Sequence, residues 1–168
     1  LSLIPQIVNH TITINIADGT YAEAVVLSGK IGKGVIKLLP SAGVILTGIT
    51  DSYASSAAKV TLSVEHCYCG VGIVNNPIII KPAGNLGSSD YCAIDIFSSV
   101  IPRPSLTFNI NGNDVTTTGI KKGITALGSI AYICQSSISN CGVAIIATLQ
   151  AKTNVYDVSG SGNSTVLY

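Results

Sequence analysis

Short apolar segments in which every second side chain is large recur along this chain, and Gly, Asn or Pro separates one from the next. Residues 11–16 read Thr-Ile-Thr-Ile-Asn-Ile, which places three Ile side chains on one face of an extended strand. Further segments of strand length follow at 24–27, 35–39, 44–46, 60–64, 71–73, 78–80, 93–96, 106–110, 124–126, 130–133, 143–147 and 154–156. Runs of this length between turn residues predict an all-β protein.

The composition agrees with this prediction. Ile, Val and Thr number 24, 15 and 14 among the 168 residues, so β-branched residues make up almost a third of the chain. Such residues are enriched in strands. No window longer than about ten residues has the apolar spacing and the caps of a helix. A mean hydropathy of +0.54 also excludes a disordered chain.

Charge and hydropathy limit the partners of the chain. It has 9 Lys and Arg against 8 Asp and Glu, and this balance gives no electrostatic reason to bind nucleic acid. No stretch approaches about 18 consecutive apolar residues, so we expect no membrane-inserted helix. The chain starts without Met or a basic leader and ends on apolar residues. We therefore interpret residues 1–168 as one module from a longer protein.

The C-terminal third contains two imperfect copies of one unit. Ile124-Thr125-Ala126 returns as Ile145-Ile146-Ala147 after 21 residues, and residues 140–143 return as residues 163–166 after 23. A unit of 21–23 residues with three short strands has the length of one coil of a parallel β-helix, whose coils stack at about 4.8 Å. We predict a right-handed parallel β-helix, because right-handed crossovers dominate parallel sheets.

A β-sandwich is the alternative fold. Asp18-Gly19 and Asn111-Gly112 are weak hairpin signals, and antiparallel hairpins through residues 120–168 would contradict the β-helix. If the β-helix is correct, the alternation predicts a set of buried side chains: Ile12, Ile14, Val60, Leu62, Ile94, Ile96, Ile124, Ile145 and Val155.

The opening of the chain resembles a known family. Residues 3–21, which run from Leu3-Ile4-Pro5 to Gly19-Thr20-Tyr21, resemble the first coil of pectate-lyase-like right-handed β-helices. In that family an alternating strand leads into Gly-Thr-Tyr, then an acidic residue, here Glu23, and a second strand. Similar versions occur in tail-fibre and minor structural proteins of phages and prophages of Gram-positive bacteria.

The resemblance implies a non-catalytic module, located in a virion or outside the cell, that forms a shaft or contacts a receptor. Its implied partners are a cell-surface polysaccharide and two further copies in a homotrimer. Two other functions stay open: a polysaccharide lyase or glycoside hydrolase of the same fold, and a bacterial surface adhesin module.

The carboxylates give little support to an enzyme. The eight Asp and Glu residues are scattered, so no single strand presents a pair. Stacked coils could bring Asp95 near Glu65, and a glycosidase needs two carboxylates about 5–9.5 Å apart. The simpler interpretation is that both are solvated charges on the outside. We therefore assign no catalytic, cofactor-binding or metal-ligating residue, and expect no cofactor.

The cysteines are odd in number, which argues against a closed disulfide framework. We predict that all five are reduced, small core residues: Cys67, Cys69, Cys92, Cys134 and Cys141. A metal site is the weaker interpretation, since only His10 and His66 could add imidazole ligands.

We interpret the segments that interrupt the repeat as loops, at 50–58, 83–91 and 111–122. Insertions of this kind often lie on one face of a solenoid and form its binding face. Tyr53, Tyr68 and Tyr91 lie in or near these loops and could stack against a sugar. The simpler interpretation is that each Tyr covers a corner. We also expect a loop at 30–34.

Overall fold

The computed structural model of the chain describes residues 3–52, 55–81, 90–100, 108–111 and 122–167. The protein is all-β, with 64% strand and no helix among these residues. The strands are β1 (Thr11–Ile16), β2 (Gly19–Tyr21), β3 (Val25–Ser28), β4 (Ile31–Pro40), β5 (Val44–Leu46), β6 (Thr50–Ser52), β7 (Ser55–Glu65), β8 (Tyr68–Ile73), β9 (Ile78–Ile80), β10 (Asp90–Phe97), β11 (Phe108–Asn111), β12 (Lys122–Leu127), β13 (Ile130–Cys134), β14 (Ser137–Ser139), β15 (Val143–Thr148), β16 (Lys152–Tyr156) and β17 (Thr165–Leu167). A helix that could cross a membrane is not found in these ranges.

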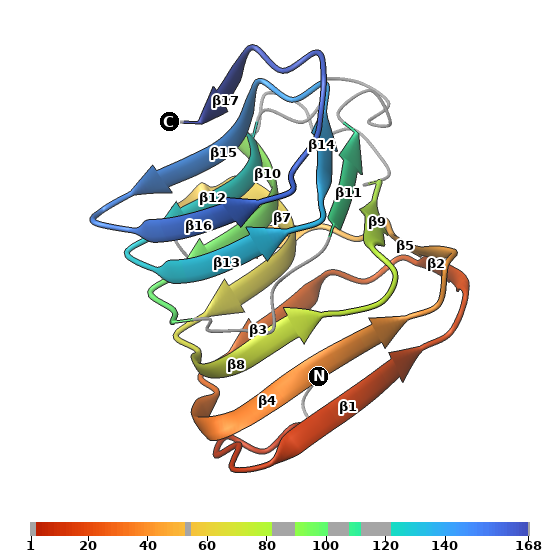
Figure 1. The fold of residues 1–168 in the computed structure, drawn as a ribbon, viewed down its shortest axis with the longest axis vertical. Coiled ribbons are helices and arrows are strands. Elements are labelled where there is room, and N and C mark those ends of the chain that lie inside the picture. Colours follow the sequence, from red (N-terminus) through yellow and green to blue (C-terminus); the bar gives the residue numbers. More distant parts are fainter. Residues whose placement is uncertain (1–2, 53–54, 82–89, 101–107, 112–121, 168) are drawn as a thin grey trace.

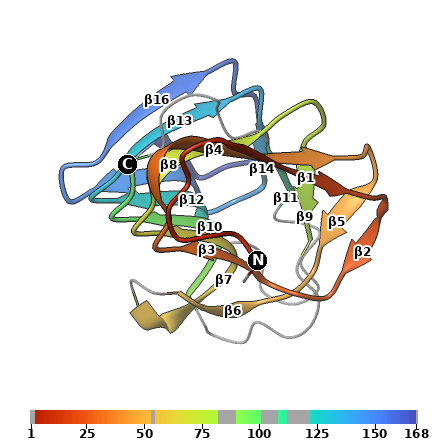
Figure 2. The ribbon, with the colours of Figure 1, turned by 90° about the horizontal axis from the view of Figure 1, so that it is seen from below.

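The strands lie on three sides of a common interior (Figures 1 and 2). The front sheet contains β1, β4 and β8, and Val100 links it to the pair β13–β16. The side sheet has the order β2-β5-β9-β11-β14, and the back sheet the order β3-β7-β10-β12-β15-β17. Along the chain, strands enter the front, side and back sheets in turn. Each round of three sheets adds one level to the stack.

All named strand pairs in the described residues are parallel except β6 with β7. Within residues 122–167 the pairs β12–β15, β13–β16 and β15–β17 are all parallel. The antiparallel hairpins that would have contradicted the prediction do not occur in that range. Asp18-Gly19 is no hairpin either, because β1 and β2 belong to different sheets.

The repeat is confirmed in one of its two offsets. Ile124 pairs with Ile145, as predicted. Val143, however, pairs with Thr165 and not with Val166, so the second offset was wrong by one residue. Nearer the N-terminus the spacing is longer, since Val25 pairs with Leu62. Extra residues in the connections between strands increase the number of residues that separate two paired strands. The strands still pair in parallel.

Several segments predicted as loops contain strands. Strand β4 begins at Ile31, inside the loop predicted at 30–34. The segment 50–58 contains β6 and the start of β7, which pair antiparallel. Of the loops predicted at 83–91 and 111–122, residues 83–89 and 112–121 lie outside the described residues. The ends of those two segments lie in β10, β11 and β12.

The core prediction is confirmed for most of its residues. Six are buried: Val60, Leu62, Ile94, Ile96, Ile124 and Ile145. Ile12 and Ile14 are half-buried and pack against the core. Val155 was predicted wrongly, because 44% of its surface is exposed. It lies in β16, which pairs on one side only, with β13, so the interior is open beside it.

In four strands of the back sheet, β7, β10, β12 and β15, the alternation of buried and exposed side chains breaks at one position. Leu62, Ile94, Ile124 and Ile145 are in register and buried, and the residue before each of them is buried as well. These preceding residues are all small: Thr61, Ala93, Gly123 and Ala144. A Cβ on Gly123 would lie 2.8 Å from Cγ2 of Ile138 in the side sheet. Small residues therefore let the two sheets approach at this bend.

The passage from the back sheet to the front sheet uses one backbone conformation repeatedly. Left-handed residues occupy this corner at successive levels: Gly29, His66, Ser98, Gly128 and Leu149. Their amides form a ladder in which Gly29 donates to the carbonyl of Glu65 and His66 to that of Phe97. The ladder continues with similar bonds from Ser98 and Gly128. At these four levels the corner thus has the same hydrogen bonding, whether Gly, His or Ser occupies it.

Candidate functional site

A cluster of polar side chains lies on the outer face of the back sheet. Asp95 of β10 is in register with Ser63 of β7 and with Thr125 of β12. Because strands alternate, these three side chains point away from Ile94 and Ile96, which are in the core. All three are nevertheless buried. Buried polar groups on an outer face are unusual and require hydrogen-bond partners.

The Asp95 carboxylate has a partner at each oxygen. The Ser52 hydroxyl donates to Oδ2 over 2.6 Å, and the Thr125 hydroxyl donates to Oδ1 over 2.6 Å. Ser52 belongs to β6, which pairs with β7 and lies at the edge of this face (Figure 2). With only 1% of its surface exposed, Asp95 is closed to large solutes.

Glu65 lies on the same face, two residues after Ser63. Its Oε1 accepts a 2.6 Å hydrogen bond from the Ser63 hydroxyl. The structure therefore brings Asp95 and Glu65 to one face on neighbouring strands. The interpretation that both are solvated charges was wrong, since both carboxylates are buried and bound by hydroxyl groups.

The hydroxyl residues of this cluster were not predicted as site residues. A signal for them exists in the sequence, because Leu62-Ser63-Val64, Ile94-Asp95-Ile96 and Ile124-Thr125-Ala126 share one pattern. Aligning the three segments would place their central residues side by side. Ser52 has no such signal, since it comes from the separate strand β6.

Cys92 borders the cluster. Its thiol donates to the carbonyl of Ile94 and lies 3.4 Å from the Thr125 hydroxyl. Burial raises the pKa of Cys92 to about 12, although the hydrogen bond with Thr125 opposes the rise. The thiol therefore stays protonated at neutral pH and is a poor nucleophile.

Burial also keeps the thiols of Cys67 and Cys69 protonated. Cys67 and Cys69 are buried on the same side of the chain, while Tyr68 between them is half exposed. Burial raises the pKa of both thiols, in Cys69 to about 11. Together with Cys92 and Cys141 they are buried and in no disulfide, which confirms the prediction of small core residues for these four. The side chain of Cys134 lies outside the described residues.

His66 and Cys67 do not form a catalytic pair. His66 is at the corner, with its ring edge-on to Phe97 at a centroid distance of 5.4 Å. The Cys67 thiol instead donates weakly to the carbonyls of Leu27 and Glu65. In the part of the chain that the structure describes, no three His, Cys, Asp or Glu side chains gather as metal ligands would.

The tyrosines do not form a common platform for sugars. Tyr91 is fully buried in the core, and its hydroxyl lies 2.6 Å from that of Thr61. Burial raises the pKa of Tyr91 as well. Tyr68 is exposed on the front sheet, and Tyr53 lies outside the described residues. The idea of one stacking surface was therefore wrong for Tyr91, because the bend at Ala93 turns its side chain inward.

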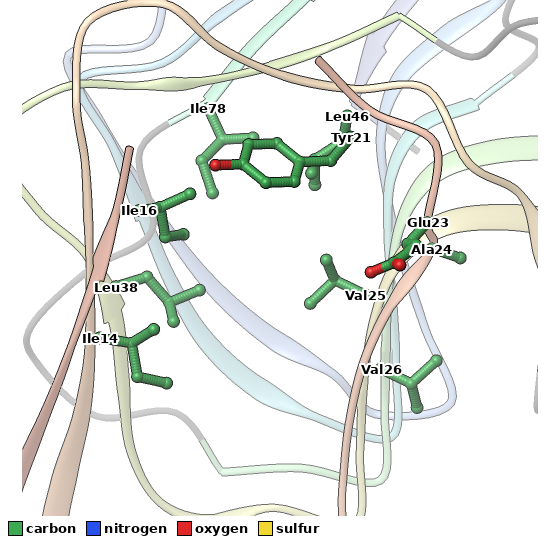
Figure 3. Close-up of a pocket in the computed structure, with 10 residues that line it drawn as sticks. All are labelled: Ile14, Ile16, Tyr21, Glu23, Ala24, Val25, Val26, Leu38, Leu46 and Ile78. Atoms are coloured by element: carbon green, nitrogen blue, oxygen red, sulfur yellow. The ribbon is translucent and has the colours of Figure 1, made fainter. Parts of the chain in front are cut away.

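An open pocket of about 200 Å³ lies at the end of the stack beside β1 and β3 (Figure 3). Ile14 and Ile16 face Val25 across it, and Tyr21 lies at one side. Glu23 is the one carboxylate among its lining residues, which are otherwise mainly aliphatic. The pocket is an uncovered part of the core, and the other polar side chain in its lining, Tyr21, has its hydroxyl bound to the carbonyl of Ala17.

Comparisons of the chain with models of protein families, with curated proteins and with solved structures found no match. The case for a function therefore depends on the residues and their geometry.

Proposed function

We propose that the chain folds as a right-handed parallel β-helix and serves as a non-catalytic structural module of a phage or prophage tail fibre. One observation carries this proposal: the chain repeats the order front, side and back, and each strand pairs in parallel with its counterpart one level away. Stacking of this kind builds a rod from a single chain, with the backbone hydrogen bonds between levels along its length.

The polar cluster supports a structural role over a catalytic one. A general acid or base must be within hydrogen-bond reach of its substrate. Both oxygens of Asp95 are already bound by Ser52 and Thr125, and the residue is buried. A closed network of this kind holds neighbouring strands and β6 together.

The opening of the chain supports the assignment to fibre proteins. Gly19-Thr20-Tyr21 forms β2, and strands β1 and β3 flank it in the order that the resemblance implies. The Tyr21 hydroxyl donates to the carbonyl of Ala17 and so closes the corner between β1 and β2. The tail fibre, the cell-surface polysaccharide and the homotrimer of the intact fibre are parts of this proposal.

The proposal is tested in three ways. An experimental structure must have right-handed coils. Peptides of the chain should be found by mass spectrometry in purified phage particles. The chain should not degrade polygalacturonate or alginate in the presence of calcium, as measured by unsaturated-product absorbance and by reducing ends. A left-handed or antiparallel fold would overturn the fold, and absence from every particle would overturn the fibre.

A polysaccharide lyase or glycosidase is the second candidate, because Asp95 and Glu65 do come to one face. The matched variants are Asp95→Asn at the cluster and Asp157→Asn at an exposed control position. Turnover that is lost in Asp95→Asn and kept in Asp157→Asn would establish the enzyme. Equal behaviour of both variants would exclude a role for the cluster in any activity detected.

A further inference from the structure

A hollow of about 320 Å³ lies between the first residues of β4 and those of β8, which are neighbours in the front sheet (Figure 1). Its lining includes Gly32, Lys33, Gly34, Tyr68 and Gly70. Lys33 is exposed, and so is 50% of the surface of Tyr68, so the hollow opens to solvent on the outer side of this sheet. It is separate from the pocket at the end of the stack and from the polar cluster of the back sheet.

An irregularity in β4 forms one wall of the hollow. Ile31 pairs with Tyr68 and Val35 with Gly70, so β4 has two more residues than β8 over this stretch. The extra residues form a bulge that contains Lys33. Bulges of this kind re-aim a side chain, and they are frequent beside functional sites. The bulge thus accounts for the place of Lys33 in the lining of the hollow.

The two glycines that flank Lys33 are required by the backbone. Gly32 has a φ of 129°, and a Cβ on it would lie 2.2 Å from the carbonyl oxygen of Val8. A Cβ on Gly34 would lie 2.3 Å from the carbonyl oxygen of His10. Neither position has room for a side chain, so Lys33 alone presents one from this bulge.

Tyr68 forms the opposite wall. Its hydroxyl lies 3.4 Å from that of Ser98 at the corner of the next level, which limits the rotation of the ring. Gly70 follows on the same side of β8, and a Cβ there would lie 2.8 Å from Cγ2 of Val35. The hollow therefore has an exposed aromatic ring beside a floor of glycine backbone, with one lysine facing them.

The front side of the stack is positively charged. Its described strands, β1, β4, β8, β13 and β16, contain no Asp or Glu, but Lys33, Lys37 and Lys152 lie in them. Neither Lys33 nor Lys37 has an acidic partner among the described residues, where the one ion pair joins Lys59 to Asp51. Such a segregation of charge gives this side a positive potential although the chain as a whole is almost neutral. The ligand that complements it is an anion.

We propose that the hollow binds one sugar residue that carries a negative charge. C–H groups of the sugar ring pack against the exposed face of Tyr68, because an aromatic face attracts such groups. Lys33 pairs with the carboxylate or phosphate of the same residue. At about 320 Å³ the hollow is at the small end of ligand pockets, which suits a single ring. The inference deepens the proposed function and rests on it for the polysaccharide to which this sugar belongs.

The pairing of one aromatic ring with one cation selects this ligand over others. A nucleic acid binds through several phosphate contacts at once. The hollow offers Lys33, with Lys37 four residues further along β4. A neutral sugar leaves the charge of Lys33 unused, and a simple inorganic anion makes no contact with Tyr68. A charged sugar uses both walls.

An NMR titration of the intact chain tests the inference. Glucose and galactose are each added in three forms: the uronate, the 6-phosphate and the methyl glycoside. At least one charged form should bind with a dissociation constant of roughly 1 mM, and its methyl glycoside at least tenfold more weakly. The amide resonances of Gly32, Gly34 and Gly70 should shift. The form that binds more tightly shows whether the charge is a carboxylate or a phosphate.

Variants of the two walls have matched controls. Lys33→Gln should weaken binding of the charged sugar at least fivefold, whereas Lys152→Gln, at an exposed lysine outside the hollow, should change it less than twofold. Tyr68→Ala should also weaken binding at least fivefold, and Tyr68→Phe should retain it. Tyr156→Ala is the aromatic control, because Tyr156 is 75% exposed and lies outside the hollow. Circular dichroism establishes that each variant is folded. Lys33→Met and Tyr68→Thr replace a variant that fails to fold.

Four results would each overturn the inference: no shift of these amides with any charged sugar, equal binding of the methyl glycosides, equal losses in a wall variant and its control, or the same shifts and affinity with inorganic phosphate alone. The test is independent of the fibre. A chain that binds the sugar but is absent from every phage particle loses the proposed fibre and keeps the site. A chain that is found in particles but does not bind loses only the site.

Discussion

Thr125 and Asp95 are neighbours on two parallel strands, and the Thr125 hydroxyl donates a 2.6 Å hydrogen bond to the Asp95 carboxylate. On the opposite side of the same carboxylate, Ser52 donates from β6. One buried charge therefore connects strands β6, β10 and β12. A carboxylate in this position is stable only while its donors remain, because a buried charge without partners is costly.

We predict that Thr125→Val lowers the free energy of unfolding by about 1.5–3 kcal/mol, the value of a hydrogen bond to a charged group. Thr and Val have similar shapes, so packing changes little. Urea unfolding followed by circular dichroism provides the measurement. Thr125→Ser, which keeps the hydroxyl, is the control and should lose less. Equal stability of Thr125→Val and the unchanged chain would mean that Asp95 finds another donor.

From the raised pKa of the Cys92 thiol, we predict that the folded chain loses stability in alkali. Its pKa is about 12 in the folded chain against an ordinary value of 9.0. Between these values the thiol loses its proton in the unfolded chain and keeps it in the folded chain. The contribution of Cys92 to the free energy of unfolding is therefore intact below pH 9 and falls as pH rises toward 12. The expected slope is about 1.4 kcal/mol per pH unit.

Urea unfolding at about pH 8 and about pH 10.5 measures this slope in the unchanged chain and in Cys92→Ala. The variant removes the titrating group, so its stability should fall less between the two pH values. A comparable fall in both chains would assign the alkaline loss to other groups, such as the buried Tyr91.

Adding a side chain to a glycine at a left-handed corner should lower the free energy of unfolding. Gly29 has a φ of 66°, and no neighbouring atom lies within 4 Å of the place that a Cβ would take, so Gly29→Ala adds backbone strain without a clash. We expect a loss of about 1–2 kcal/mol. Gly43→Ala is the control, because its Cβ would make only ordinary contacts, at 3.5 Å or more, with Asp18. Thermal unfolding should separate the two variants by several degrees. Identical melting temperatures would show that the corner adapts.

The bend in the back sheet predicts a larger loss at Gly123. A Cβ there would lie 2.5 Å from the carbonyl oxygen of Ala144 and 2.8 Å from Ile138. Gly123→Ala should therefore lower the free energy of unfolding more than Gly29→Ala does. The difference should be about 1–3 kcal/mol, the usual cost of overpacking. Urea midpoints of the two variants give the comparison. If Gly123→Ala is the more stable of the two, the sheets have room to separate at this point.

The parallel pairing near the C-terminus could be predicted from the sequence because the repeat there is short and regular. Ile124 and Ile145 occupy matching places in two copies of the same unit, and they do pair. In the N-terminal half the insertions differ in length, so the pairing of Val25 with Leu62 leaves no repeat to detect. Alternation still identified buried residues such as Leu62 in that half, since it depends on each strand alone.

The polar cluster was harder to predict. Asp95 and Glu65 were named as the pair that stacking could bring together, but their burial was not foreseen. Exposure on the outer face of a strand depends on what covers it, and Ser52 arrives from a strand outside the repeat. The same limit applies to Tyr91, whose side chain would face outward if the strand alternated without the bend.

The parallel pairing at every level has a mechanical consequence. Hydrogen bonds between levels, such as those of β13 with β16, point along the stack, so a pull on its two ends loads them one level at a time. Where Val143 and Thr165 mark one full turn, release of that turn frees roughly 75 Å of extended chain. For the proposed β-helix we therefore expect resistance to bending while the stack is intact, and lengthening in discrete steps, each dissipating work, when its two ends are pulled apart.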